Sequence, residues 1–137
     1  MAKRTAQRSS ALSASPCPCG LGEAYRECCG MLHQGQAAAT AEQLMRSRYS
    51  AFVVHDTSYL LRTWSAQTRP ENVRFDNRLR WTGLEVLGST GGSAFHTEGT
   101  VEFRAHYVID GTPGEQHENS RFLRENGEWV FDRAIRR

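Results

Sequence analysis

Two short segments, Cys17-Pro18-Cys19-Gly20 and Cys28-Cys29-Gly30, hold all four cysteines of this 137-residue chain. Thiols at such a density serve either to cross-link the chain or to bind a metal ion. A disulfide between Cys17 and Cys19 would be strained, and one between Cys28 and Cys29 would distort the peptide bond that joins them. Disulfides between the two pairs and free thiols stay open as alternatives. Four thiolates around one tetrahedral ion meet no such objection, so the spacing predicts a metal site formed by Cys17, Cys19, Cys28 and Cys29.

The expected ion is zinc, because a four-thiolate tetrahedral shell is typical of structural zinc sites. Iron is the alternative ion, since the same shell suits a rubredoxin-like centre. Four cysteines complete the shell, which argues against metal-catalysed hydrolysis, and His33 is then expected to be a surface residue. A further alternative is redox sensing, because the adjacent thiolates of Cys28 and Cys29 would release the ion on oxidation.

The stretch 17–30 resembles the SEC-C motif, the small metal-binding module at the C-terminus of the SecA translocation ATPase. It is closer still to the Cys-Cys form of the motif in the YchJ-like family of bacterial proteins. Tyr25 stands at the aromatic position, whereas Leu21 departs from the usual Ser between the glycines. Segments 44–52, 63–64 and 120–127 extend the resemblance to nearly the whole chain after residue 15. It implies a metal-binding knuckle followed by an NTF2-like domain.

The expected fold class is therefore α+β, with three parts along the chain. Residues 1–15 are expected to be a disordered basic tail, because they offer little to bury. Residues 16–33 are expected to be the SEC-C-like knuckle, and residues 40–137 an NTF2-like (cystatin-like) roll. In such a roll the helices pack on a curved antiparallel sheet.

The middle of the chain predicts two helices. Thr40 with Gln43 three residues later is a capping box, and the apolar stripe that follows has helical spacing. The residues of that stripe are Ala41, Leu44, Met45, Tyr49, Phe52 and Val53. Arg46, Ser47 and Ser50 fall largely outside it. Asp56 is read as the N-cap of a second, shorter helix rather than as a catalytic partner of His55.

The second half of the chain predicts four strands, over residues 81–87, 94–109, 115–124 and 129–134. Asn126-Gly127 predicts a two-residue type I′ hairpin, which sets the register of the last two strands. The expected partners are Arg124 with Trp129, Leu123 with Val130, Phe122 with Phe131, Arg121 with Asp132, Ser120 with Arg133 and Glu118 with Ile135. Breaks are expected at 91–92 and 111–114, where glycines cluster.

This register predicts a candidate pocket between the sheet and the helices. The Phe122 face is expected to be the core side, so Glu118 and Ser120 would also point inward. Tyr107 and Trp81 are expected to line the same cavity, joined by His96 if Gly99 forms a β-bulge. The alternative is that Glu118 pairs with Arg133 or another buried cation and closes the end of the roll. The polar row that contains Glu102, Arg104 and His106 is expected to be the solvent face of the sheet.

The net charge is +2, and Lys3, Arg4 and Arg8 lie in the tail, so the remaining chain is close to neutral. A nucleic-acid partner is therefore not expected. No apolar run reaches the roughly 20 residues of a membrane span, and the N-terminus lacks the apolar stretch of a secretory signal. A cytoplasmic protein with reduced thiols is the consistent expectation.

These observations favour a protein-interaction module over an enzyme. By resemblance to the SecA tail, the expected partners are the translocation machinery, ribosomes or nascent chains. A homodimer through the outer face of the sheet is also considered. The alternative function is an NTF2-like small-molecule-binding protein or enzyme that uses a pocket near Glu118.

Overall fold

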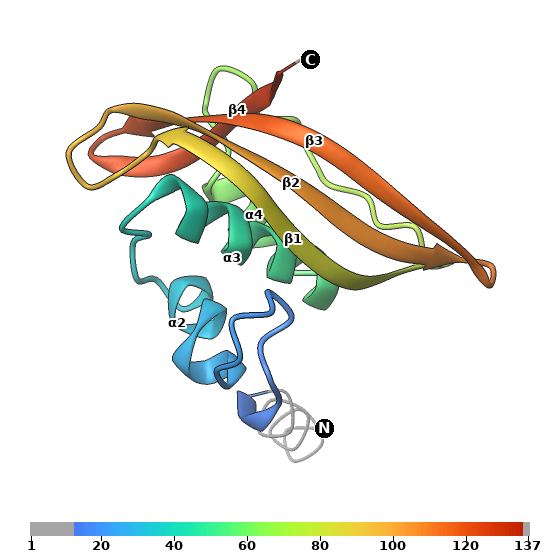
Figure 1. The fold of residues 1–137 in the computed structure, drawn as a ribbon. Helices are drawn as coiled ribbons and strands as arrows, with labels where there is room; N and C mark the ends of the chain where they lie inside the picture. The colour runs from blue at the N-terminus through green and yellow to red at the C-terminus, as the bar shows by residue number, and fades with distance from the viewer. Residues whose placement is uncertain (1–12, 136–137) are drawn as a thin grey trace.

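The computed structural model describes residues 13–135, in which helices pack against one face of a curved antiparallel sheet (Figure 1). The elements are η1 (Tyr25–Glu27), α2 (Cys29–His33), α3 (Ala41–Val54), α4 (Thr57–Arg62), β1 (Leu79–Gly91), β2 (Glu98–Ile109), β3 (Thr112–Glu125) and β4 (Glu128–Ile135). The strand order β1-β2-β3-β4 follows the chain, with antiparallel neighbours throughout. The predicted α+β fold is confirmed. The prediction of a disordered tail falls mainly on residues 1–12, which lie outside the described residues.

Both predicted helix caps are present. The Thr40 hydroxyl accepts a hydrogen bond from the Gln43 amide at 3.1 Å, which opens α3. The Gln43 side chain reaches back to the amide of Ala39, one residue before the cap, at 2.6 Å. The Asp56 carboxylate accepts from the Tyr59 amide at 3.0 Å and opens α4. Asp56 thus satisfies a helix N-terminus, which explains the residue without a catalytic role.

Helix α3 is buried on two faces, which corrects the expectation for its serines. Ser47 and Ser50 were expected largely outside the apolar stripe, yet both are fully buried. The reason is that α3 lies between the sheet on one side and the cysteine segment on the other (Figure 1). A helix that packs on one side only has a polar outer face, whereas the outer face of α3 packs against the cysteine segment.

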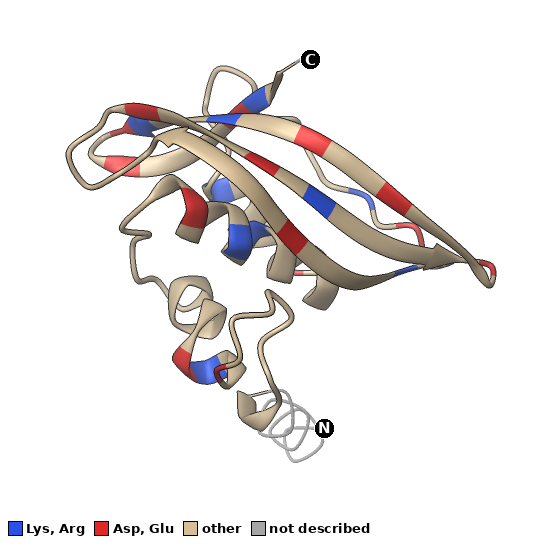
Figure 2. Cartoon of the chain, viewed as in Figure 1, with Lys and Arg blue, Asp and Glu red and all other residues tan. Residues whose placement is uncertain are grey.

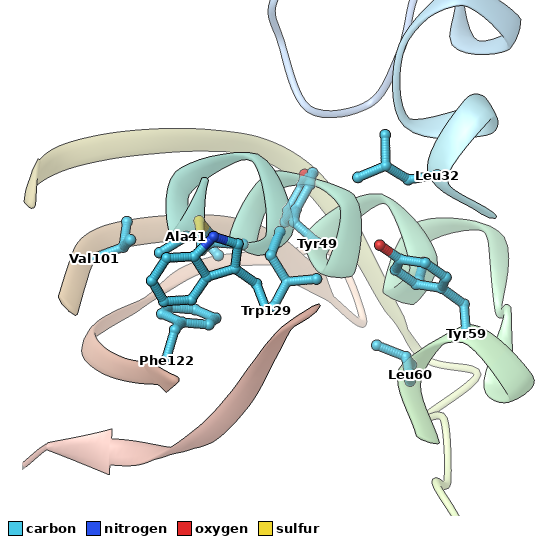
Figure 3. Packing of buried hydrophobic residues seen from close by; sticks show 12 residues of the cluster. Leu32, Ala41, Tyr49, Tyr59, Leu60, Val101, Phe122 and Trp129 are labelled. Atoms are coloured by element: carbon cyan, nitrogen blue, oxygen red, sulfur yellow. The ribbon is translucent and has the colours of Figure 1, made fainter. Parts of the chain in front are cut away.

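The core lies between α3, α4 and the inner face of the sheet. Figure 3 shows Trp129 and Phe122 from the last hairpin extending toward the helix that carries Ala41. Trp129 is 2 % exposed, and its indole N–H donates to the carbonyl oxygen of Ala39 at 3.3 Å. Complete burial of a large apolar side chain stabilises a fold by roughly 1.5–3 kcal/mol.

The last hairpin has the predicted turn but not the whole predicted register. Asn126 and Gly127 have φ of 54° and 82°, as a type I′ turn requires. The pairs nearest the turn are confirmed: Arg124 with Trp129, Leu123 with Val130 and Phe122 with Phe131. Beyond Phe131 the register shifts by one residue, because Asp132 is an extra residue on β4.

The expected pairs of Arg121, Ser120 and Glu118 are therefore wrong. Arg121 lies opposite Arg133, Ser120 opposite Ala134, and it is Asn119 that lies opposite Ile135. The shift occurs where β4 also bonds to the segment after α4. The Phe131 amide donates to the carbonyl of Thr63 at 2.8 Å, and its carbonyl accepts from the Ser65 amide at 2.7 Å.

The other strands differ from expectation mainly at their ends. β2 begins at Glu98, so Phe95 lies in the preceding loop and is 97 % exposed. No bulge occurs at Gly99, which pairs regularly with Gly91 and Phe122. The bulges lie in β1 instead, at residues 82 and 87. The turn between β2 and β3 is shorter than the expected break at 111–114. It consists of Asp110 and Gly111, which both have positive φ, and β3 begins directly after them at Thr112.

Candidate functional site

The four cysteine sulfurs lie within 4.8 Å of one another. Cys17, Cys19 and Cys29 are buried, Cys28 is half-buried, and none of the four forms a disulfide. The Sγ atoms of Cys19 and Cys28 are 3.5 Å apart. Sulfurs bound to one tetrahedral zinc at about 2.3 Å would lie about 3.8 Å from each other. The donor set and its spacing therefore fit a single ion.

The first cysteine pair lies on a tight loop. The amide of Cys17 donates to the carbonyl oxygen of Glu23 at 2.8 Å, and the amide of Gly20 donates to the carbonyl oxygen of Cys17 at 3.2 Å. Gly20 and Gly22 have φ of 87° and 93°, a region that side chains other than glycine rarely adopt. The loop therefore turns back on itself so that both thiols face the same point.

The second cysteine pair lies at the junction of η1 and α2. The amide of Cys28 donates to the carbonyl oxygen of Tyr25 at 3.0 Å, and Cys29 is the first residue of α2. A β-carbon built on Gly30 would lie 2.6 Å from that same carbonyl oxygen. Only glycine therefore allows the short helix to approach Tyr25 this closely.

The thiols share protons within the cluster. Hydrogen bonds from Cys19 and Cys29 hold the pKa of Cys17 far below that of an ordinary thiol. The hydrogen bond of Cys29 to Cys17 raises the pKa of Cys29, and burial raises that of Cys28 to about 12. These raised pKa values favour protons on Cys28 and Cys29 when no ion is bound. A divalent cation that displaces those protons would turn every ligand into a thiolate.

The cysteine knuckle (residues 16–33) is fastened to α3. The Sγ atom of Cys17 lies 3.6 Å from the hydroxyl of Ser50. The guanidinium of Arg46 donates to the carbonyl oxygen of Cys19 at 2.9 Å. These contacts place a hydroxyl and a cation beside a cluster that becomes anionic when it is fully deprotonated.

His33 is a buried link rather than the surface residue that the sequence predicted. Its side chain is 4 % exposed. Nδ1 accepts a hydrogen bond from the Tyr25 hydroxyl at 2.5 Å, and Nε2 donates to the carbonyl oxygen of Ser47 at 2.8 Å. Burial lowers the pKa of His33, which keeps the ring neutral with its proton on Nε2. The missed signal is that His33 ends α2, directly after the buried Leu32.

A cavity of about 260 Å³ lies between α3 and the inner face of the sheet. Its lining consists of Met45, Arg48, Tyr49, Phe52, Trp64, Trp81, Phe103, Ala105, Gln116, Glu118, Ser120, Phe122, Phe131 and Ala134. Glu118, Ser120 and Trp81 thus lie where the sequence placed them. Tyr107 is not on this lining and packs edge-on against Trp81, with ring centroids 5.6 Å apart.

His96 does not reach the cavity. It lies in the loop before β2, where its Nδ1 accepts from the Ser93 hydroxyl at 2.6 Å. The prediction that brought it inward required a bulge at Gly99, and the regular pairing of Gly99 removes that route.

Glu118 forms no ion pair with Arg133 or with any other cation of residues 13–135, so the alternative in which such a pair closes the roll is wrong. One Glu118 carboxylate oxygen accepts from the Gln116 side chain at 2.9 Å, and the other accepts from the Ser120 hydroxyl at 2.8 Å. Arg133 lies 3.4 Å from Asp132 instead. The bulge at Asp132 moved the register and took Arg133 away from Glu118.

Arg48 is the cavity residue that the sequence reasoning missed. It is 6 % exposed, and its Nη1 donates to the carbonyl oxygen of Leu60 and to the hydroxyl of Thr63, both at 2.8 Å. Its guanidinium carbon lies 4.9 Å from the Trp64 ring centre and 4.8 Å from that of Phe131. Burial lowers the pKa of Arg48 to about 9.

A signal for Arg48 was present in the sequence. The residue lies four positions after Leu44 and four before Phe52, so helical spacing places it on the apolar stripe. A charged residue inside such a stripe is expected to be buried with polar partners.

The strands of the sheet carry residues of both charge signs (Figure 2), and several of them pair across neighbouring strands. His106 lies 2.6 Å from Glu85, and His117 lies 2.7 Å from Glu102. Arg104 lies 2.9 Å from Glu115. The polar row is thus the solvent face of an antiparallel sheet. Within residues 13–135 no helix has the length and apolar character that would let it cross a membrane.

Comparisons with known proteins agree with this architecture. Residues 40–134 match the family model described as YchJ, middle NTF2-like domain. A UPF0225 protein of Streptomyces coelicolor is 59 % identical over 117 residues, which covers 85 % of this chain and 91 % of that protein. A UPF0225 protein of Ralstonia nicotianae is 46 % identical over 128 residues, covering 84 % of this chain and 87 % of the relative.

Two solved structures are similar over most of the chain. The solution structure of a SEC-C motif-containing protein from Rhodopseudomonas palustris has a TM-score of 0.75 and 34 % identity, covering 88 % of this chain and 98 % of that one. The crystal structure of a SEC-C motif-containing protein from Psychrobacter arcticus has a TM-score of 0.73 and 28 % identity. The match covers 88 % of this chain and 82 % of the Psychrobacter arcticus chain. This chain thus shares its overall fold with proteins that contain a SEC-C motif.

Proposed function

The chain belongs to the YchJ family of SEC-C and NTF2-like architecture, and from that premise we propose that it is a zinc protein whose knuckle docks a protein partner. The observation that carries the proposal is the convergence of four cysteine sulfurs within 4.8 Å. A segment of this size folds stably when a metal supplies the missing core.

The donor set favours zinc. Zinc accepts four thiolates in a closed tetrahedral shell, and such a shell leaves no position for a substrate. Iron is the competing ion, because a rubredoxin-like centre uses the same ligands. The ion then has a structural role: it fixes the loop of Cys17 and Cys19 against α2.

The knuckle presents apolar side chains to solvent, as a docking surface does. Leu21 is 56 % exposed and Met31 is 39 % exposed. Both line a groove of about 170 Å³ where the knuckle meets α3, with Gln43 and Arg46 on the helix side. Exposed apolar side chains rimmed by polar ones are typical of protein contacts.

The proposed partners are the translocation machinery, ribosomes or nascent chains, by resemblance to the SecA tail, and the proposed location is the cytoplasm. A second copy of the chain is the competing partner. Its docking on the mixed-charge outer sheet face would involve Glu85 and Arg104 rather than Leu21 and Met31.

Metal analysis after anaerobic purification tests the first half of the proposal. We expect one zinc per chain, and loss of that zinc in the variant Cys28→Ser with Cys29→Ser. Iron would be recognised by its thiolate charge-transfer absorbance. Folded protein that contains neither metal would overturn the proposal.

A pull-down from bacterial lysate tests the second half. The double variant Leu21→Ser with Met31→Ser is expected to keep its zinc and to lose the partner. Leu87→Ser is the matched control, because Leu87 is 42 % exposed but lies on β1 and does not line the groove. A partner retained equally by all three proteins would exclude the knuckle as the docking surface.

A second candidate function is small-molecule binding by the roll, with or without catalysis. The observation that favours it is the cavity of about 260 Å³, which reaches Glu118 and is not closed by an ion pair with Arg133. Cavities between a sheet and a helix are common ligand sites.

A further inference from the structure

Arg48 is a buried cation with no carboxylate of the described residues at ion-pair distance; the charge of Glu118 raises its pKa but does not offset the larger effect of burial. No carboxylate of residues 13–135 forms an ion pair with it, although Glu118 lines the same cavity. A buried charge is costly to the fold unless it is paired. The structure therefore retains a group that destabilises the empty protein, and the cavity it lines is where compensation could come from.

The hydrogen bonds of Arg48 leave one edge of the guanidinium free. Both of its donated bonds come from Nη1, to the Leu60 carbonyl and the Thr63 hydroxyl. Within the described part of the chain, Nε and Nη2 of Arg48 have no hydrogen-bond partner. Neither atom is among the unpartnered polar atoms that are fully inaccessible to solvent. These two N–H groups form the side of the fork that matches a carboxylate in bidentate geometry.

The position of the guanidinium is held firmly. Trp64 and Phe131 flank it at 4.9 Å and 4.8 Å, with their own ring centroids 5.2 Å apart. Such a setting fixes the fork before a ligand arrives, which lowers the entropy cost of binding.

The other side chains that line the cavity favour a ligand with an apolar body. The aromatic rings of Tyr49, Phe52, Trp81, Phe103 and Phe122 lie on the same cavity. The second polar feature is Glu118, held by Gln116 and Ser120. Its negative charge disfavours a ligand with a second anionic group. The volume of about 260 Å³ is below the usual range for drug-sized ligands, so the occupant is small.

We propose that Arg48 anchors a small monocarboxylic acid with an apolar body in the cavity between α3 and the sheet. This inference rests on the second candidate function, that the roll binds a small molecule, and it names the class of that molecule. The carboxylate accepts from Nε and Nη2 of Arg48, and the apolar body lies against Trp81 and its aromatic neighbours.

Titration of the zinc-loaded full chain with matched acids and amides tests this assignment. The probes are 3-phenylpropionate, indole-3-acetate and hexanoate, each compared with its primary amide, which has the same shape without the charge. Binding is followed by ¹H–¹⁵N NMR, including the indole signals of Trp64 and Trp81. We expect at least one acid to bind about tenfold or more tightly than its amide.

Two variants locate the effect at the cavity. Arg48→Met is expected to abolish the preference for the acid, and Glu118→Gln is expected to strengthen binding of the acid several-fold by removing a nearby negative charge. Zinc content and circular dichroism report whether each variant is folded. Should Arg48→Met fail to fold, the acid–amide comparison and Glu118→Gln still decide the question.

The possible outcomes distinguish the role of Arg48 from small-molecule binding by the roll. Equal binding of acids and amides would overturn the role of Arg48 while leaving small-molecule binding in place. Binding of none of the six probes would overturn both. Acid binding that survives Arg48→Met unchanged would also overturn the inference. None of these results bears on the zinc centre, which is read from metal content.

Discussion

His33 donates from Nε2 to the main-chain carbonyl oxygen of Ser47 at 2.8 Å, which joins the cysteine knuckle to the middle of α3. The hydroxyl of Ser47 in turn lies 2.6 Å from that of Tyr59 on α4. The metal-bearing segment is thus part of the packing of the roll rather than an appendage on a free linker. The stability of the two parts is expected to be coupled.

Removal of the metal is expected to destabilise the whole chain. Structural zinc contributes roughly 10–16 kcal/mol of apparent binding free energy in small peptides, and losing it would uncover one face of α3. We expect a strong chelator to lower the melting temperature, followed by the near-ultraviolet circular dichroism of the packed aromatic side chains. The variant Cys28→Ser with Cys29→Ser is the control, on which the chelator should have no effect. An unchanged melting temperature in the wild type would show that the roll is independent of the ion.

Gly30→Ala is expected to weaken the metal site. The new β-carbon would overlap the carbonyl oxygen of Tyr25 at 2.6 Å, and overpacking of this kind costs about 1–3 kcal/mol. The shift would also move Cys29, so zinc should be lost to a competing chelator more readily. Gly88→Ala is the matched control, because a β-carbon there meets nothing within 4 Å. Equal zinc retention by both variants would contradict the close packing of α2 on Tyr25.

His33→Phe is expected to lower the free energy of unfolding by about 1–3 kcal/mol, because it leaves the half-buried Tyr25 hydroxyl without its acceptor and the Ser47 carbonyl without its donor. Urea denaturation of the zinc-loaded proteins measures this loss. His96→Ala is the control; His96 is exposed, and such a change usually alters stability by less than about 0.5 kcal/mol. If the two variants were equally stable, His33 would not be the link between the knuckle and α3.

The same histidine predicts a pH dependence. Burial lowers the pKa of His33 in the folded chain below the value of about 6.5 for an unfolded histidine. Between these two values the unfolded chain binds more protons, so stability falls as the pH falls. The contribution of His33 is complete above about pH 6.5 and is lost toward the folded pKa.

The difference in unfolding free energy between wild type and His33→Phe isolates this term. We expect the difference to shrink between about pH 6.5 and pH 5 and to be constant above pH 7. A difference that grows on acidification would mean that the folded chain binds the proton more tightly, through Asp56 at 3.9 Å.

Two arginine substitutions are expected to have opposite consequences for stability. Arg121 lies 2.6 Å from Asp132, whose side chain is 9 % exposed, so Arg121→Met weakens the pairing of a buried carboxylate and should cost about 1–3 kcal/mol. Arg48→Met removes a buried cation that has no carboxylate partner. Replacement of buried charge by apolar side chains is often neutral or stabilising.

Urea denaturation of the two variants measures this contrast. We expect Arg48→Met to lie within about 1 kcal/mol of the wild type or above it. A loss larger than that of Arg121→Met would mean that the bonds of Arg48 to Leu60 and Thr63 outweigh the cost of its burial.

Local chemistry determined much of this protein in advance. The cysteine spacing predicted that four thiols would converge, because neither adjacent pair can close on itself without strain. Thr40, Asp56 and Asn126-Gly127 acted as caps and a turn, since each satisfies or sets the backbone within a few residues. The Trp129, Val130 and Phe131 register followed from that turn.

Only the tertiary structure decided the rest, because those features depend on contacts between distant segments. Phe131 bonds to Thr63 and Ser65, and the bulge at Asp132 beside these bonds moved Arg133 away from Glu118. The knuckle covers the second face of α3, which buries Ser47 and His33. Sequence spacing describes one face of a helix and one register of a hairpin. It does not describe which other segment will pack there, and that packing made Arg48 a buried cation in an aromatic cavity.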